Sequence, residues 1–191
     1  MANRRTFLKS GLAATVLTAT SSLAEQANNA QQPSPVQRKG RIRQSASRGC
    51  YKQFTVDQLC MHAAQIGLKG IDLLGIEDFE VPRRYGLVCA MGYAGGGTIP
   101  DALNRTENHA AIEEAFRKNI PIAAKAGVPN IITFSGNRRG MPDEEGARNT
   151  IAGLNRLKKI AEDNGVTICL ELLNSKRNHK DYMADHTAWG A

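Results

Sequence analysis

A single acidic residue interrupts an apolar run near the end of the sequence. The segment VTICLELLNSK, residues 166–176, begins like a buried strand and then places Glu171 before two leucines. A buried carboxylate is costly unless it is paired, protonated or bound to a metal. Glu171 is therefore the first candidate for acid–base or metal chemistry. The competing structural interpretation is a salt bridge to a neighbouring Lys or Arg.

Further polar residues follow the ends of predicted strands. Asn137 comes directly after an apolar run at 130–136, and Asn174 follows the run that contains Glu171. The next segment, RNHKDYMADHTAWG at 177–190, is rich in His, Asp and Tyr and includes His186. Loops at the carboxyl ends of parallel strands converge on one site. Asn137, Asn174 and His186 are thus candidate substrate contacts. The alternatives are a solvated loop and, for His186, the cap of a following helix.

Alternating strand-like and helix-like stretches must position these residues. Apolar runs predict five strands, at about 41–51, 70–75, 86–91, 130–136 and 166–172. Helical spacing predicts helices at about 55–67, 106–127 and 143–164. Thr55 and Gln58 form a capping-box pattern, Thr106 is an expected N-cap, and Pro121 is expected to interrupt the second helix. The third helix is expected to bury one apolar face: Ala147, Ile151, Leu154, Leu157 and Ile160.

This alternation indicates an α/β fold with a parallel sheet. A doubly wound sheet is disfavoured because no GxGxxG follows the first strand, and GYAGGGT at 92–98 does not lead straight into a helix. A (β/α)₈ barrel usually needs about 250 residues, but only about 150 follow the N-terminal segments, enough for about five βα units. We therefore predict a partial (β/α)₈ barrel. Its open sheet edges indicate a fragment of a longer protein or self-association.

The N-terminus has the layout of an export signal. Paired arginines in RRTFLK precede an uncharged run and a small-x-small cleavage site, which predicts a twin-arginine signal peptide at 1–24. A polar linker at 25–38 and a folded domain at 39–191 follow. The run is too short for a stable membrane anchor. Export to the periplasm or the medium is expected.

The charge pattern argues against a nucleic-acid partner, and the cysteine spacing favours buried thiols. The formal charge of +7 falls to +4 without the three basic residues of the leader, and the remaining basic residues are scattered. No nucleic-acid partner is therefore expected. The four cysteines form no CxxC pair. Cys50, Cys89 and Cys169 lie in apolar runs and are expected to be small buried groups, although a disulfide is not excluded by spacing.

Three segments together resemble the hydroxypyruvate isomerase-like proteins of the xylose-isomerase-type TIM barrels. They are TFSGNR at 133–138, LELLNS at 170–175 and DYMADHTAWG at 181–190, and the resemblance extends over 39–191. It implies that Glu171 is a ligand of Mg²⁺ or Mn²⁺ and an acid–base group. It also implies further ligands from strands six to eight, which this sequence lacks.

The resemblance implies isomerisation or epimerisation of a small sugar or hydroxy-carbonyl compound through an enediolate. One carboxylate removes a proton next to the carbonyl and another returns it. A non-catalytic remnant or carbohydrate-binding protein is the main alternative. A zinc nuclease of the endonuclease IV type shares the barrel but takes histidines from early strand ends, whereas His62 and His109 fall on predicted helices.

Overall fold

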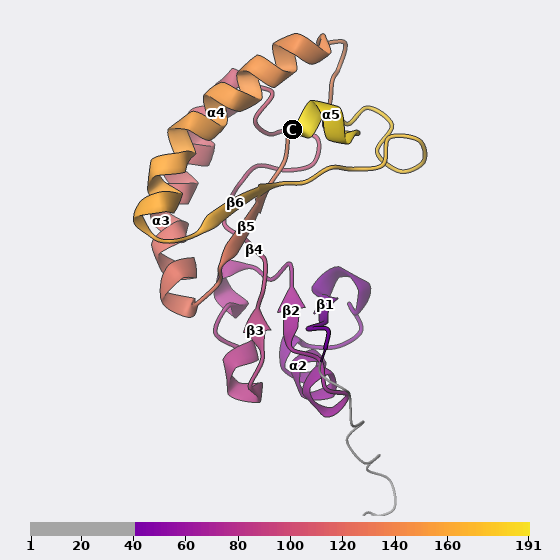
Figure 1. The fold of residues 1–191 in the computed structure, drawn as a ribbon, viewed down its shortest axis with the longest axis vertical. Coiled ribbons are helices and arrows are strands. Elements are labelled where there is room, and N and C mark those ends of the chain that lie inside the picture. Colours follow the sequence, from indigo (N-terminus) through magenta and orange to yellow (C-terminus); the bar gives the residue numbers. More distant parts are fainter. Residues whose placement is uncertain (1–40) are drawn as a thin grey trace, which may run out of the picture. The chain divides into compact units, whose positions relative to one another are not determined.

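A computed structural model describes residues 41–191, and the predicted leader and linker lie outside them. The described chain alternates short strands with helices, as the sequence predicts (Figure 1). The strands are β1 (Ser45–Ser47), β2 (Gly70–Asp72), β3 (Val88–Cys89), β4 (Gly92–Tyr93), β5 (Asn130–Thr133) and β6 (Thr167–Leu170). The α-helices are α2 (Val56–Gln65), α3 (His109–Ala126), α4 (Asp143–Asp163) and the short α5 (Thr187–Gly190).

All strand pairs within the sheets are parallel. The strand orders are β1-β2-β3 and β4-β5-β6, and an isolated parallel bridge between Leu74 and Gly92 connects the two sets. The predicted third strand, 86–91, is therefore only the two-residue strand β3, and β4 lies at 92–93, in the glycine-rich segment that was not predicted as a strand. The predicted first strand is also much shorter than 41–51, because a 3₁₀ turn at Arg48–Cys50 ends it.

The first and third helices begin close to the predicted positions. Thr55 caps α2 in a full capping box: its hydroxyl accepts from the Gln58 backbone N–H, and the Gln58 side chain accepts from the Thr55 N–H. Thr106, the expected N-cap of the next helix, instead starts a 3₁₀ turn that leads into α3. Gly127 closes α3 in a left-handed conformation, φ 74°.

Pro121 does not interrupt α3, so that prediction was wrong. The helix continues through the proline to Ala126. Pro121 and the residue four positions earlier, Arg117, are both exposed, so the carbonyl that loses its helical donor faces solvent. Ile120 and Ala123, on the two sides of the proline, are fully buried. Packing of these side chains keeps the helix continuous.

The buried face of α4 differs from the predicted one. Ile151 is exposed, at 59%, while Gly146, Thr150 and Gly153 are buried beside Leu157 and Ile160. Small residues let the helix approach its neighbours closely: a Cβ on Gly153 would lie 2.8 Å from Leu103 and 2.9 Å from His109. Cys50 is also exposed, contrary to expectation, because it lies in the 3₁₀ turn after β1.

Two apolar clusters lie on opposite faces of the strands. The larger joins Ile71 and Ile131 to helix residues such as Phe116 and Leu157. The smaller contains Ile132 and Phe134 with Ala102, Tyr182 and Ala184. Ile131 and Ile132 are neighbours in sequence and face opposite ways, as strand geometry requires. Helices α3 and α4 pack together beside β5 and β6 (Figure 1), so the second cluster faces away from them.

Candidate functional site

Glu171 is the first residue after β6, at the carboxyl end of the parallel strands. Its backbone N–H donates to the carbonyl of Thr133, 3.0 Å away, so the sheet ladder fixes its position beside β5. Glu171 lines a hollow of about 520 Å³ on the face opposite the helices. The other lining residues are Ser45, Ser47, Asp72, Leu73, Ala90, Met91, Asn130, Ile132, Cys169 and Leu170.

The carboxylate of Glu171 has no hydrogen bond or ion pair within residues 41–191. The salt-bridge alternative is therefore not realised in the described part of the chain. Burial raises the pKa of Glu171, and the charge of nearby His179 partly opposes that shift. A half-buried carboxylate with a raised pKa and no partner can accept or donate a proton more readily near neutral pH than a surface glutamate.

Tyr182 fixes the backbone on which Glu171 is mounted. The phenol is completely buried and donates to the Glu171 carbonyl oxygen over 2.9 Å. The Tyr182 hydroxyl oxygen also accepts from the backbone N–H of Ser135 over 3.0 Å. One hydroxyl thus joins the chain after β5 to the chain after β6. It satisfies two backbone groups that the sheet no longer pairs.

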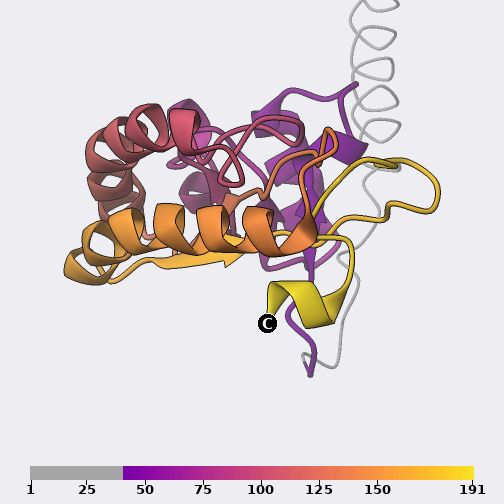
Figure 2. The ribbon, with the colours of Figure 1, turned by 90° about the horizontal axis from the view of Figure 1, so that it is seen from above.

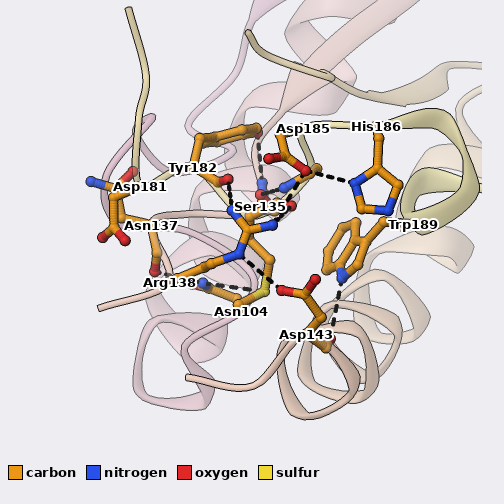
Figure 3. A network of polar contacts seen from close by, with 12 residues as sticks. Asn104, Ser135, Asn137, Arg138, Asp143, Asp181, Tyr182, Asp185, His186 and Trp189 are labelled. Carbon is orange, nitrogen blue, oxygen red and sulfur yellow. Dashed lines mark hydrogen bonds and ion pairs between the residues drawn. The ribbon is translucent and has the colours of Figure 1, made fainter. Parts of the chain in front are cut away.

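Arg138 holds the segment around Tyr182 against the loop after β5 (Figure 3). Its guanidinium donates to the carbonyls of Tyr182 and Met183 and forms ion pairs with Asp143 and Asp185 at 2.9 and 3.2 Å. Trp189 donates its indole N–H to the Asp143 carbonyl over 3.1 Å, which brings α5 to the start of α4 (Figure 2). We call residues 135–138 and 181–185 with these bonds the Arg138 clamp.

All the interactions of the Asp185 carboxylate serve the Arg138 clamp and its neighbours. Hydrogen bonds from Ser175, His186 and Arg138 hold the pKa of Asp185 well below its usual range. His186 contacts it through Nδ1, at 2.6 Å from the carboxylate oxygen (Figure 3). This group is ionised and fully engaged, so its environment is typical of a structural acid.

The structure separates the predicted site residues into three hollows. Glu171 lines the first. Asn174 and His186 line a second, of about 470 Å³, together with Asp185. Asn137 lines a third, of about 400 Å³, with residues of the 177–181 loop. Asn174 is exposed, and its side-chain oxygen accepts from the Lys176 N–H over 2.9 Å, while His186 is exposed at the N-cap of α5.

Several residues around the first hollow were not predicted. Asp72 ends β2 and accepts from the hydroxyl of Ser45 on the neighbouring strand. The acid inside GIDLLG was the available signal, because it also interrupts an apolar run. Arg138 and Tyr182 lie in two of the segments that carry the family resemblance, but nothing in the sequence indicated their contacts. Their roles depend on bonds between positions 44 and 47 residues apart in sequence.

Glu171 does not belong to a cluster of potential metal ligands among the described residues. Within 41–191 no group of three or more His, Cys, Asp or Glu side chains is close enough to bind one ion. Mg²⁺ and Mn²⁺ prefer several oxygen ligands, and Glu171 supplies one side chain. His62 and His109 lie on α2 and α3, and His109 is buried against the Leu103 carbonyl at 2.8 Å. No helix among the described residues is long and apolar enough to cross a membrane.

These features define a partial parallel α/β barrel with a carboxylate at the carboxyl ends of its strands. Residues 80–188 match the family described as Xylose isomerase-like TIM barrel. The chain belongs to this family. A search of curated proteins gave no match.

Solved structures of similar fold include sugar epimerases. D-Psicose 3-epimerase from Clostridium cellulolyticum H10, solved with D-tagatose, is 13% identical with TM-score 0.57, over 72% of this chain and 54% of that one. 3-Keto-D-glucoside 4-epimerase from E. coli is 16% identical with TM-score 0.57, and the match covers 74% of this chain and 58% of that one. An AP endonuclease, family 2, from Brucella melitensis is 15% identical with TM-score 0.56, and the match covers 74% of this chain and 59% of that one. The chain thus spans little more than half of each.

Proposed function

We propose that this chain carries part of a sugar or hydroxy-carbonyl isomerase or epimerase site, of the hydroxypyruvate isomerase-like kind, with Glu171 as its acid–base group. The observation that carries the proposal is the unpartnered carboxylate of Glu171 at the carboxyl ends of the strands, facing a hollow of about 520 Å³. The family membership and the fold shared with sugar epimerases support this class of substrate.

The chemistry assigned to Glu171 is proton transfer at carbon. The carboxylate takes a proton from the carbon next to a carbonyl. The electron pair of that C–H bond forms a carbon–carbon double bond, and the π pair of the carbonyl moves onto its oxygen to give an enediolate. Return of the proton to the former carbonyl carbon, with transfer of the hydroxyl proton from the neighbouring oxygen to the former carbonyl oxygen, gives an isomer; return of a proton to the opposite face of the first carbon gives an epimer. The raised pKa of Glu171 brings its protonated and ionised forms closer in energy at neutral pH.

Exchange of a carbon-bound proton with solvent tests this step directly. The full chain is incubated in D₂O with D-fructose or with hydroxypyruvate, with and without Mn²⁺, and deuterium incorporation is followed by NMR. Glu171→Gln is expected to slow exchange by about 10²- to 10⁴-fold. The matched control, Glu144→Gln on the exposed first turn of α4, should exchange at the wild-type rate. Equal rates for the wild type and Glu171→Gln would refute the assignment.

A metal role for Glu171 is a separate part of the proposal. Bound Mg²⁺ or Mn²⁺ would stabilise negative charge on substrate oxygens. The test is the thermal stability of the chain: Mn²⁺ should raise the melting temperature of the wild type, and Glu171→Gln should abolish that rise. A rise that persists in Glu171→Gln would place the ion elsewhere. Binding of sugar without any proton exchange would favour the alternative, a non-catalytic carbohydrate-binding protein.

We also propose twin-arginine export of the chain to the periplasm or the medium. RRTFLK and the uncharged run after it support this assignment. Replacement of Arg4 and Arg5 by lysine should leave the protein inside cells that otherwise export it, as measured by fractionation. Export that is unaffected by the two changes would contradict the proposal.

A further inference from the structure

The glycine-rich segment GYAGGGT remained without a role in the sequence analysis, and its tyrosine lies near Glu171. Tyr93 ends β4 and pairs in register with Ile132 of β5, which in turn pairs with Cys169 of β6. Phe134 and Glu171 each follow their strand partners by two positions. Side chains two apart in an extended chain share a face, so Tyr93, Phe134 and Glu171 stand on the same face at the carboxyl ends of three neighbouring strands.

Contacts of the Tyr93 ring support this arrangement. The ring stacks on Phe134, with centroids 6.4 Å apart and planes 27° from parallel. Phe134 is buried, at 4% exposure, whereas Tyr93 is 40% exposed. The charge of Glu171 also adds to the effect of burial in raising the pKa of the Tyr93 phenol. One face of the ring is therefore supported by the core, while a large part of the side chain stays open close to the carboxylate.

The glycines keep the following loop flat against the sheet. Gly96 has no room for a side chain, because its Cβ would lie 2.7 Å from the Ile132 carbonyl. Gly95 has φ +90°, and a Cβ there would meet Ala115 at 2.6 Å. The Thr133 hydroxyl holds the loop by donating to the Gly96 carbonyl over 2.7 Å. A loop with larger side chains would have to move away from β5, and the Tyr93 ring would then be displaced from its position against Phe134.

We propose that Tyr93 is a substrate-contacting residue, whose ring packs against the carbon–hydrogen face of a small polyhydroxy ketose while Glu171 reaches the reacting carbon. This inference rests on the proposed function. A sugar combines an apolar face with polar edges, and a tyrosine ring offers the same combination: an apolar face with a hydroxyl that stays protonated and donates at neutral pH. The segment thus serves as an aromatic support for the substrate rather than as a phosphate loop.

Binding of D-fructose to the full chain, measured by saturation-transfer difference NMR, tests the inference. Tyr93→Ala should weaken binding about five- to tenfold, and Tyr93→Phe should retain most of the affinity because the stacking ring remains. Tyr51 is equally exposed, at 39%, but lies in the turn after β1, so Tyr51→Ala is the matched control and should bind like the wild type.

The outcomes separate this inference from the proposed function. Unchanged affinity in Tyr93→Ala overturns the role of Tyr93, and proton exchange that still depends on Glu171 would then leave the proposed function intact. An equal loss of D-fructose affinity in Tyr93→Ala and Tyr93→Phe would refute the claim that the ring packs against the sugar. A wild-type chain that binds no ketose overturns both. Spectrophotometric titration provides a check of position. The charge of Glu171 raises the pKa of both Tyr93 and Tyr182, so Glu171→Gln should lower both values, and only the Tyr182 change should remain in the Tyr93→Phe background.

Discussion

Two carboxylates lie close to the end of β6, and their surroundings differ completely. Asp185 is held by Ser175, His186 and Arg138, and its pKa is far below the usual range. Glu171 has no donor within residues 41–191, and burial raises its pKa. Asp185 stabilises the fold as an ion, whereas the ionised form of Glu171 is unfavourable in the fold.

This difference separates a structural acid from a candidate catalytic one. Polar groups that serve the fold have satisfied hydrogen bonds. A carboxylate left half-buried without a partner lowers stability, and such a cost is typical of functional sites. Through Tyr182, the Arg138 clamp joins the backbone of Glu171 to Ser135 after β5, so a well-satisfied region positions the carboxylate without a partner. The predictions below test each side of this contrast.

Removal of the Arg138 guanidinium should have the largest effect on stability. Arg138→Ala breaks two ion pairs and leaves the carbonyls of Tyr182 and Met183 without these donors. We expect a loss of about 2–4 kcal/mol in the free energy of unfolding, measured with urea. The exposed pair of Arg83 and Glu80 provides the control, because Arg83→Ala should cost less than about 1 kcal/mol. Equal losses of unfolding free energy in Arg138→Ala and Arg83→Ala would show that the clamp contributes no more than an exposed ion pair.

Removal of the Tyr182 hydroxyl should be the next largest change. Tyr182→Phe leaves the Ser135 N–H without its acceptor and the Glu171 carbonyl without a donor. The expected loss is about 1–3 kcal/mol in urea unfolding. The hydroxyl of Tyr85 donates to partly exposed Asp57, so Tyr85→Phe should cost less. An unchanged free energy of unfolding in Tyr182→Phe would mean that the segments after β5 and β6 stay together without this hydroxyl.

Acid should weaken the clamp through Asp185. Because folding lowers the pKa of Asp185, its contribution is complete above the unfolded pKa of about 3.9 and is lost as the pH falls through the lower folded value. The stability difference between the wild type and Asp185→Asn should thus be constant near neutral pH and shrink in acid. Asp163→Asn, at an exposed pair with Lys159, should show a smaller difference at every pH. A pH-independent gap for Asp185→Asn would contradict the assignment.

Neutralisation of Glu171 should have the smallest effect, with the opposite sign. Its pKa is raised in the fold, so the fold is favoured below the unfolded pKa and loses that advantage as the pH rises through the folded value. Glu171→Gln should raise the melting temperature by about 1–2 °C at pH 7. The gain should disappear below about pH 4, where both side chains are neutral. A lower melting temperature at pH 7 would mean that the carboxylate has a stabilising partner.

The sequence predicted the order and type of the elements well, and their details less well. Alternating apolar runs and the Thr55 capping box depend on neighbouring residues, so they could be recognised without the fold. The course of α3 through Pro121 could not, because packing of Ile120 and Ala123 outweighs the lost hydrogen bond. The buried face of α4 was misjudged for a similar reason: close contacts with Met183 at Gly146, and with Leu103 and His109 at Gly153, leave no room for larger side chains on that face, and Ile151 is exposed.

The sequence by itself determined that a carboxylate stands at the end of an apolar strand, because burial makes such a placement costly wherever the strand lies. Only the tertiary structure decided which carboxylate is free and which is engaged. That outcome depends on Arg138 and Tyr182. Arg138 bonds to Tyr182, and Tyr182 bonds to Ser135, across more than forty positions of sequence. Electrostatic and hydrogen-bonding environments are set by distances in space, and the spacing of residue types along the chain does not contain those distances.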